Sequence, residues 1–149
     1  MEGPLYTGEW LSGNFVRVHI NTDSTVETTE LVRYTPPFRD LPTMDLVVLS
    51  EPEILAEKMR ALMTRSQPRD LYDSYHLISK GVAIDRELAT RKLAYYDLEY
   101  DRTAVSERIR ALEAAWPAMD HLVYGRVPPF EAVATTVTSA LPETPGGDG

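Results

Sequence analysis

The chain has 149 residues, of which 43% are hydrophobic and 26% are charged, a composition typical of one globular domain. Its formal net charge of −8 argues against a protein that coats nucleic acid or an anionic membrane surface. The absence of cysteine excludes disulfides and thiolate metal sites, and no apolar run approaches the ~20 residues of a membrane span. The first residues, MEGPLYTGEW, lack the features of a signal peptide, so we expect a cytoplasmic protein without a membrane partner.

The N-terminal third predicts β-strands. NFVRVHIN (14–21) alternates with the period of two that is typical of a half-buried strand. TVETTELVRY (25–34) predicts a second strand, which the turn residues TDST would join to the first as a hairpin. After a proline-containing break, MDLVVLS (44–50) predicts a third strand, central and buried. We therefore expect strands over about residues 13–50.

Helices are predicted over about residues 51–141. Ser50 and Glu53 have the spacing of a capping box, and the helix that follows runs to about residue 65. Leu55, Met59 and Leu62 form its apolar stripe. Further helices are expected over 69–80, 86–98, 104–116 and 128–141, followed by a disordered tail over 142–149. Strands followed by helices indicate an α+β fold in one domain, residues 1–141.

Positive charge is concentrated in one part of this acidic chain. Residues 58–83 carry five basic and two acidic side chains, a net charge of +3. Residues 1–57 carry three basic and ten acidic side chains. A local positive patch is what a phosphate site requires. Solvated helix charges would give the same counts, so both interpretations stay open.

The spacing of the charged residues places them on two consecutive helices. Lys58 and Arg65 are two turns apart and share a face, while Asp70 and Asp73 are one turn apart on the next helix, with Arg69 four residues before Asp73. In one interpretation, Lys58 and Arg65 contact phosphates and the two carboxylates orient them or help to hold a metal. In the other, Arg65 and Arg69 pair with the carboxylates and only lock the helices together.

SEPEILAEKMRALMTRSQPRDLYDSYHL (50–77) resembles the signature of the AbiEii/AbiGii-type nucleotidyltransferase toxins of abortive-infection and type IV toxin–antitoxin systems. The matching residues are, in order, Glu53–Ile54, Glu57–Lys58, Ala61, Arg65, Arg69–Asp70 and Asp73. The likeness extends over roughly residues 10–100. It implies a nucleotidyltransferase-like palm followed by helices. It also implies transfer of a nucleoside monophosphate from a nucleoside triphosphate (NTP) to an RNA or protein acceptor, with Mg²⁺ as cofactor and an antitoxin as partner.

The same resemblance assigns roles within the site. Lys58 and Asp73 would be the catalytic residues, with Lys58 on the triphosphate. Arg65 and Arg69 would be further phosphate-binding cations. Asp70 would be a supporting carboxylate, and the metal ligands are unknown.

The metal-binding half of the family pattern is missing from this sequence. Such enzymes carry a glycine-rich turn with a serine, followed by a D-x-D pair on a strand that binds the metals. LSGN (11–14) is followed by no such pair, and no D-x-D or D-x-E precedes Lys58. The chain therefore resembles the C-terminal part of the family. It is either an enzyme completed by other carboxylates or a truncated, inactive relative that binds nucleotide, RNA or a protein partner.

A palm sheet that lacks strands exposes an edge that must be covered. Pairing with a second copy of the chain is one way to cover it, so we expect a homodimer through this edge.

Overall fold

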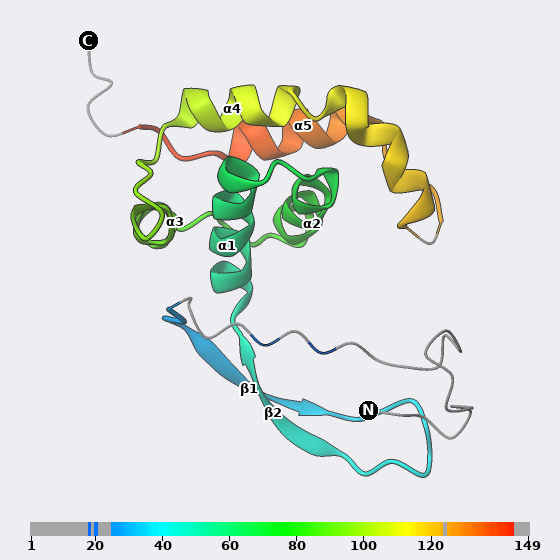
Figure 1. Ribbon diagram of the computed structural model, residues 1–149. Coiled ribbons are helices and arrows are strands. Elements are labelled where there is room, and N and C mark those ends of the chain that lie inside the picture. Colours follow the sequence, from blue (N-terminus) through cyan, green and yellow to red (C-terminus); the bar gives the residue numbers. More distant parts are fainter. Residues whose placement is uncertain (1–17, 19, 21–24, 124, 145–149) are drawn as a thin grey trace.

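In the computed structural model, which describes residues 18, 20, 25–123 and 125–144, two strands precede a set of helices (Figure 1). The strands are β1 (Thr29–Tyr34) and β2 (Met44–Leu49). The helices are α1 (Glu51–Thr64), α2 (Pro68–Ser79), α3 (Arg86–Ala94), α4 (Arg102–Arg110), the 3-10 helix η1 (Glu113–His121) and α5 (Phe130–Ala140). This arrangement confirms the predicted α+β fold class. None of the helices in the described part is long and apolar enough to cross a membrane.

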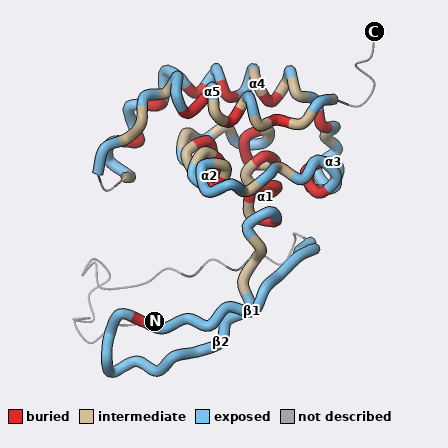
Figure 2. The backbone as a smooth tube through the Cα atoms, turned by 180° about the vertical axis from the view of Figure 1, so that it is seen from behind, coloured by how far each residue is buried: buried red, intermediate tan, exposed pale blue. Residues whose placement is uncertain are grey.

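The strands form a two-stranded antiparallel sheet in which Thr29 lies opposite Leu49 and Tyr34 opposite Met44. Within the described residues, β1 therefore pairs with β2. The predicted strand over 14–21 lies largely outside the described residues. β2 is exposed from Met44 to Val47 and half-buried only at Val48 and Leu49, so the prediction of a buried central strand is wrong. Figure 2 shows the reason, because the sheet projects from the helices as a pale blue, exposed hairpin.

The core lies among the helices, with α1 at its centre (Figure 1). Leu55, Met59 and Leu62 are fully buried on α1, which confirms the predicted apolar stripe. They belong to one cluster with buried side chains of α2, α3, α4, η1 and α5. Trp116 of η1 packs edge-to-face against Phe130, and its indole N–H donates to the carbonyl oxygen of Pro128 (3.1 Å). Aromatic burial of this kind fixes the last helix on the core.

The helix boundaries around α3 and α4 differ from the prediction. α3 ends at Ala94, four residues early, because Asp97 has a left-handed backbone (φ 58°) that a helix cannot continue through. α4 begins at Arg102, where the Asp101 side chain accepts the Thr103 N–H (2.8 Å). Beyond Arg110 the chain continues as η1, which runs through Pro117 instead of ending before it.

The predicted disordered tail does not fit residues 142–144. The hydroxyl of Tyr100 donates to the carbonyl oxygen of Pro142 (2.8 Å), and the Arg102 N–H donates to Thr144 Oγ1 (3.0 Å). Arg102 also forms an ion pair with Glu143 (2.6 Å). Burial raises the pKa of Tyr100 to about 12. These contacts attach the segment after α5 to the start of α4; residues 145–149 lie outside the described part.

Candidate functional site

Four of the predicted site residues meet between α1 and α2. Asp70, in the first turn of α2, is fully buried and accepts a forked pair of hydrogen bonds from Arg65, Nε to Oδ2 (2.9 Å) and Nη2 to Oδ1 (2.7 Å). Lys58 Nζ lies 3.3 Å from Asp70 Oδ1 and 2.6 Å from Asp73 Oδ2. We call Lys58, Arg65, Asp70 and Asp73 the open cluster.

The open cluster has a buried floor and an exposed rim. Asp70 has no exposed surface, whereas the side chains of Lys58, Asp73 and Arg65 are 22%, 44% and 46% exposed. Burial alone would raise the pKa of Asp70, but the Arg65 hydrogen bonds and the Lys58 charge outweigh it and hold that pKa below its usual value. Asp70 is therefore ionised at neutral pH and keeps both cations in place.

Arg69 does not join this group. It is exposed at the start of α2, and among the described residues it makes no ion pair or side-chain hydrogen bond. The predicted network of two arginines and two aspartates is thus a network of one arginine, one lysine and two aspartates. Ser74 adds a local bond, because its hydroxyl donates to the carbonyl oxygen of Asp70 (2.7 Å).

A second ionic group lies on the opposite side of α1, against α3. Lys92 of α3 is only 5% exposed, and its Nζ lies 2.5 Å from Glu53 Oε1 and 3.1 Å from Glu57 Oε1. It also donates to the carbonyl oxygen of Thr25. Glu53 is fully buried and accepts the backbone N–H groups of Glu27 (3.1 Å) and Thr28 (3.2 Å). We call Glu53, Glu57 and Lys92 the closed cluster.

Only half of the predicted capping box forms, because the Ser50 N–H donates to the carbonyl oxygen of Thr28 and not to the Glu53 carboxylate. Ser50 caps α1, since its Oγ accepts the Glu53 N–H (3.3 Å). The carboxylate of Glu53 turns away to the closed cluster. Its pKa is lowered, because the Lys92 ammonium and the backbone N–H of Glu27 outweigh the opposing effect of burial.

The sequence reasoning missed the closed cluster, although one signal was present. Lys92 is four residues after Leu88, so it falls on the apolar stripe that α3 presents to the core. A lysine in that position must find acceptors inside the protein. Its partners lie far away in the sequence, on α1 and before β1, which is why no local pattern indicated them.

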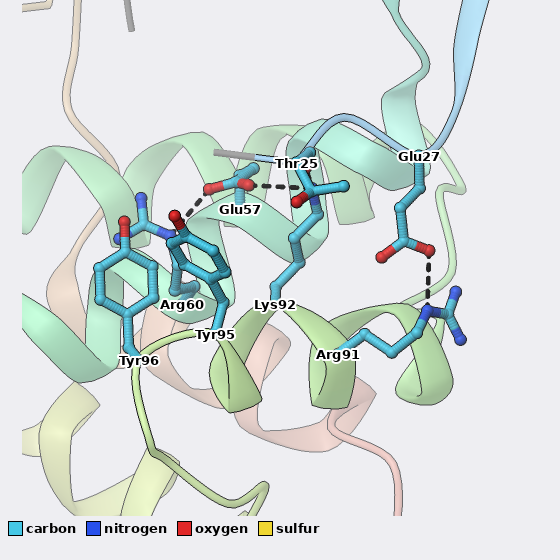
Figure 3. Close-up of a pocket in the computed structure, with 8 residues that line it drawn as sticks. All are labelled: Thr25, Glu27, Glu57, Arg60, Arg91, Lys92, Tyr95 and Tyr96. Atoms are coloured by element: carbon cyan, nitrogen blue, oxygen red, sulfur yellow. Dashed lines mark hydrogen bonds and ion pairs between the residues drawn. The ribbon is translucent and has the colours of Figure 1, made fainter. Parts of the chain in front are cut away.

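A small cavity of about 110 Å³ opens beside the closed cluster (Figure 3). Its lining comes from the segment before β1, from α1, and from α3 with the two residues after it: Thr25, Glu27, Glu57, Arg60, Arg91, Lys92, Tyr95 and Tyr96. Each of its cations has a partner. Arg60 pairs with Glu57 (2.8 Å) and lies over the Tyr96 ring (4.7 Å to its centroid), and Arg91 pairs with Glu27 (2.7 Å). This internal pairing leaves the cavity without free charge for an ionic ligand.

Comparison with protein families decides the broader identity. The family described as nucleotidyl transferase AbiEii toxin, type IV TA system, matches residues 5–136. The chain belongs to this family. The match covers nearly the whole chain, more than the residues 10–100 over which the motif indicated a likeness. No curated protein and no solved structure shows significant similarity to the chain.

Membership of this nucleotidyltransferase toxin family raises the question of the metal. Within residues 25–123 and 125–144, no group of three or more His, Cys, Asp or Glu side chains could hold a metal ion. In the open cluster, Arg65 and Lys58 occupy both oxygens of Asp70, which leaves Asp73 as the only carboxylate for a cation. Mg²⁺ takes oxygen ligands in octahedral geometry. The described residues do not fit such a site.

Proposed function

We propose that the chain is a nucleotidyltransferase-like toxin that binds the triphosphate of an NTP at the rim of the open cluster. Family membership supports the class, and the position of Lys58 carries the proposal. Its ammonium is held between buried Asp70 and exposed Asp73, yet the side chain remains 22% exposed. A lysine fixed in this way presents a positive charge at the surface without losing side-chain freedom on binding.

The other residues have complementary roles in this proposal. Arg65 offers its remaining guanidinium nitrogen, Nη1, to a phosphate, because only Nε and Nη2 are bound to Asp70. Arg69, exposed at the start of α2, adds positive charge beside it. Asp70 orients Lys58 and Arg65. Asp73 is the catalytic carboxylate that lies beside the lysine at the rim.

The proposed reaction is nucleotidyl transfer. A hydroxyl oxygen of an RNA or protein acceptor forms a bond to the α-phosphorus of the NTP, and the bond to the bridging oxygen breaks. Pyrophosphate leaves with the bonding electrons, and the acceptor proton passes to a carboxylate, for which Asp73 is the candidate. Mg²⁺ is the cofactor that the family implies. Because the described residues do not fit it, transfer depends on carboxylates beyond them.

Binding and transfer of labelled nucleotides test this proposal. Each of the four NTPs, labelled in the α-phosphate, is incubated with the protein, Mg²⁺ and total RNA, and equilibrium binding is measured alongside. We expect saturable binding that weakens by about tenfold or more in Lys58→Met, since one charge-assisted contact is lost. Lys80→Met is the matched control, because Lys80 is an exposed lysine whose one ion-pair partner in the described part is distant, Glu51 at 3.9 Å. If none of the four NTPs binds to the wild-type protein, the proposal is contradicted.

One observation favours a second candidate, a member of the family that binds without turnover. The described part of the chain holds no cluster of metal-ligating side chains, although two-metal chemistry is the usual route for this reaction class. This candidate expects NTP binding that depends on Lys58 but no transfer of label to RNA or protein. Its ligand would then be a nucleotide, an RNA or a protein partner.

We infer that the exposed sheet is the surface for protein partners. Leu31 and Val47, which lie opposite each other, are 71% and 73% exposed, and a two-stranded sheet is marginal without cover. A second copy of the chain would extend the sheet across its edge, and the antitoxin of the type IV system is the other candidate. Analytical ultracentrifugation of the purified chain should give a dimer. A monomer at all concentrations contradicts the homodimer.

A further inference from the structure

Lys92 connects three parts of the molecule through one ammonium group. It lies on α3, and its acceptors are Glu53 and Glu57 on α1 and the carbonyl oxygen of Thr25 before β1. An ammonium has three N–H donors, and here three acceptors are present. Such saturation is what a nearly fully buried lysine requires, so its position leaves little freedom.

Glu53 is saturated in the same way and holds the chain just before β1. Its Oε1 accepts from Lys92 and from the Glu27 N–H, and its Oε2 accepts from the N–H and the hydroxyl of Thr28 (3.2 Å each). Two further bonds support the junction. The Ser50 N–H donates to the carbonyl oxygen of Thr28 (3.2 Å), and the hydroxyl oxygens of Ser50 and Thr28 lie 2.6 Å apart, within hydrogen-bond distance. The segment before β1 is therefore held on the first turns of α1 by polar contacts.

Among the described residues, few other contacts attach the sheet to the helices. All six residues of β1 are exposed, and on β2 only Val48 and Leu49 are half-buried. Figures 1 and 2 show the hairpin projecting from the helical body beyond the start of α1. The hydrophobic effect therefore contributes little to its orientation. In the described part of the chain, that orientation depends on the covalent link at Ser50, the Ser50–Thr28 hydrogen bonds, the exposed Glu27–Arg91 pair and the closed cluster.

The closed cluster lies at the same level of α1 as the proposed phosphate site, on the other side of the helix. Glu57, which binds Lys92, is directly followed by Lys58, so the two clusters share one turn of α1. Lys58 is seven residues after Glu51, a rise of about 10 Å along the helix. A nucleotide bound by its triphosphate at Lys58 extends beyond that contact, and its sugar and base need a second surface at a fixed position.

We propose that Glu53 and Lys92 are positioning residues for nucleotide binding. They hold the β1–β2 sheet against the first turns of α1 and thereby set the position of the sheet relative to the Lys58 ammonium. This inference rests on the proposed function of Lys58. It assigns a role to the closed cluster, which contains no residue that touches the proposed triphosphate.

Hydrogen exchange and ATP binding test this role together. The variants are Glu53→Gln and Lys92→Met, each in the full chain. In both, we expect the amides of Glu27 and Thr28 to exchange about tenfold faster or more, because their acceptor is lost or released. Exchange in α2 and α5 should stay at the wild-type rate. ATP affinity should fall about tenfold, although Lys58 and its partners are intact.

Matched controls lie next to each substituted residue. Glu51→Gln alters an exposed glutamate in the same turn of α1 as Glu53, and its only ion pair with a described residue is the 3.9 Å contact with Lys80. Arg91→Met alters the residue beside Lys92. The exposed ion pair between Arg91 and Glu27 contributes little to stability. Both controls should keep wild-type exchange in α2 and α5 and wild-type ATP affinity.

Each outcome decides the inference. Unchanged exchange at Glu27 and Thr28 overturns the attachment of the sheet by the closed cluster. Faster exchange throughout α1 to α5 also overturns it, because the cluster would then hold the helical body instead. Faster exchange at the sheet with unchanged ATP affinity reduces the cluster to a structural contact and overturns the positioning role. A wild-type protein that binds no NTP rejects the proposed function and this role with it, while the exchange data still decide the attachment.

Discussion

The two sides of α1 carry similar charged groups that are arranged for different purposes. In the closed cluster, Glu53 and Lys92 are buried and every polar atom named above has a partner. In the open cluster, buried Asp70 has its partners, but Lys58 and Asp73 lie at the surface. A saturated, buried group cannot take a ligand without breaking the fold. A group with an exposed rim can exchange an internal partner for an external one.

Burial determines how much each ion pair of the two clusters contributes to the free energy of unfolding. Breaking a buried ion pair is costly because it leaves a charge without water or a partner, whereas an exposed pair contributes little. By this rule the open cluster contains both kinds of contact. Asp70 with Arg65 belongs with the structural contacts of the closed cluster, and Asp73 with Lys58 is the exchangeable part.

The largest expected effect follows from removing the buried carboxylate of the open cluster. Asp70→Ala should lower the free energy of unfolding by about 2 kcal/mol, because the charge-assisted hydrogen bonds from Arg65 and Lys58 to Asp70 are lost. Chemical denaturation at neutral pH measures this. Asp73→Ala is the comparison, and it should cost less than about 1 kcal/mol. If both variants lose the same free energy of unfolding, the distinction between buried Asp70 and exposed Asp73 is wrong.

Acid should weaken both clusters through their buried carboxyls. The pKa values of Glu53 and Asp70 are lowered in the folded protein, so the native state binds fewer protons than the unfolded chain. Their contribution to stability is therefore present above the ordinary carboxyl pKa and is lost as pH falls through the folded values. Glu53 faces Lys92, and Asp70 faces Arg65 and Lys58.

We expect the free energy of unfolding to fall below about pH 4, by up to about 1.4 kcal/mol per pH unit for each of the two carboxyls. Denaturation curves between pH 3 and pH 7 measure the slope. Asp70→Asn should remove one of the two contributions and flatten the curve. A variant that keeps the wild-type slope would show that Asp70 does not titrate in this range.

Local patterns predicted α1 well, and four of the site residues that they indicated lie together, while Arg69 stays apart. Ser50 caps α1, and the Leu55, Met59 and Leu62 stripe is buried as expected. The sequence could not distinguish buried Asp70 from exposed Asp73. That difference depends on how closely α2 packs on α1, which spacing along one helix does not encode.

Non-local contacts account for what the sequence did not reveal. The sequence indicates Glu53 as a capping residue, but its carboxylate binds Lys92 of α3 and the segment before β1 instead of the Ser50 N–H. The apolar composition of β2 correctly indicated a strand, but burial also requires a layer that covers it. No described element provides that layer for residues 44–47, and they are exposed.

The smallest expected change in stability comes with a change in binding. Asp73 Oδ2 lies 2.6 Å from Lys58 Nζ, so Asp73 and a triphosphate compete for the same ammonium. Asp73→Asn removes a negative charge from the rim and should raise ATP affinity about fivefold, or about 1 kcal/mol, with a smaller change in unfolding free energy. Label transfer should be lost if Asp73 is the catalytic carboxylate. Calorimetry at low and high salt measures the affinity, and the gain should shrink as salt screens the charge.

Asp101→Asn is the control for this experiment, because it removes one acidic charge elsewhere while asparagine still caps α4. If Asp101→Asn raises ATP affinity equally, the gain reflects only the lower net negative charge of the protein. If neither variant changes the affinity, the triphosphate does not replace Asp73 at Lys58. In that case the rim of the open cluster would be as closed to ligands as the Glu53–Lys92 side of α1.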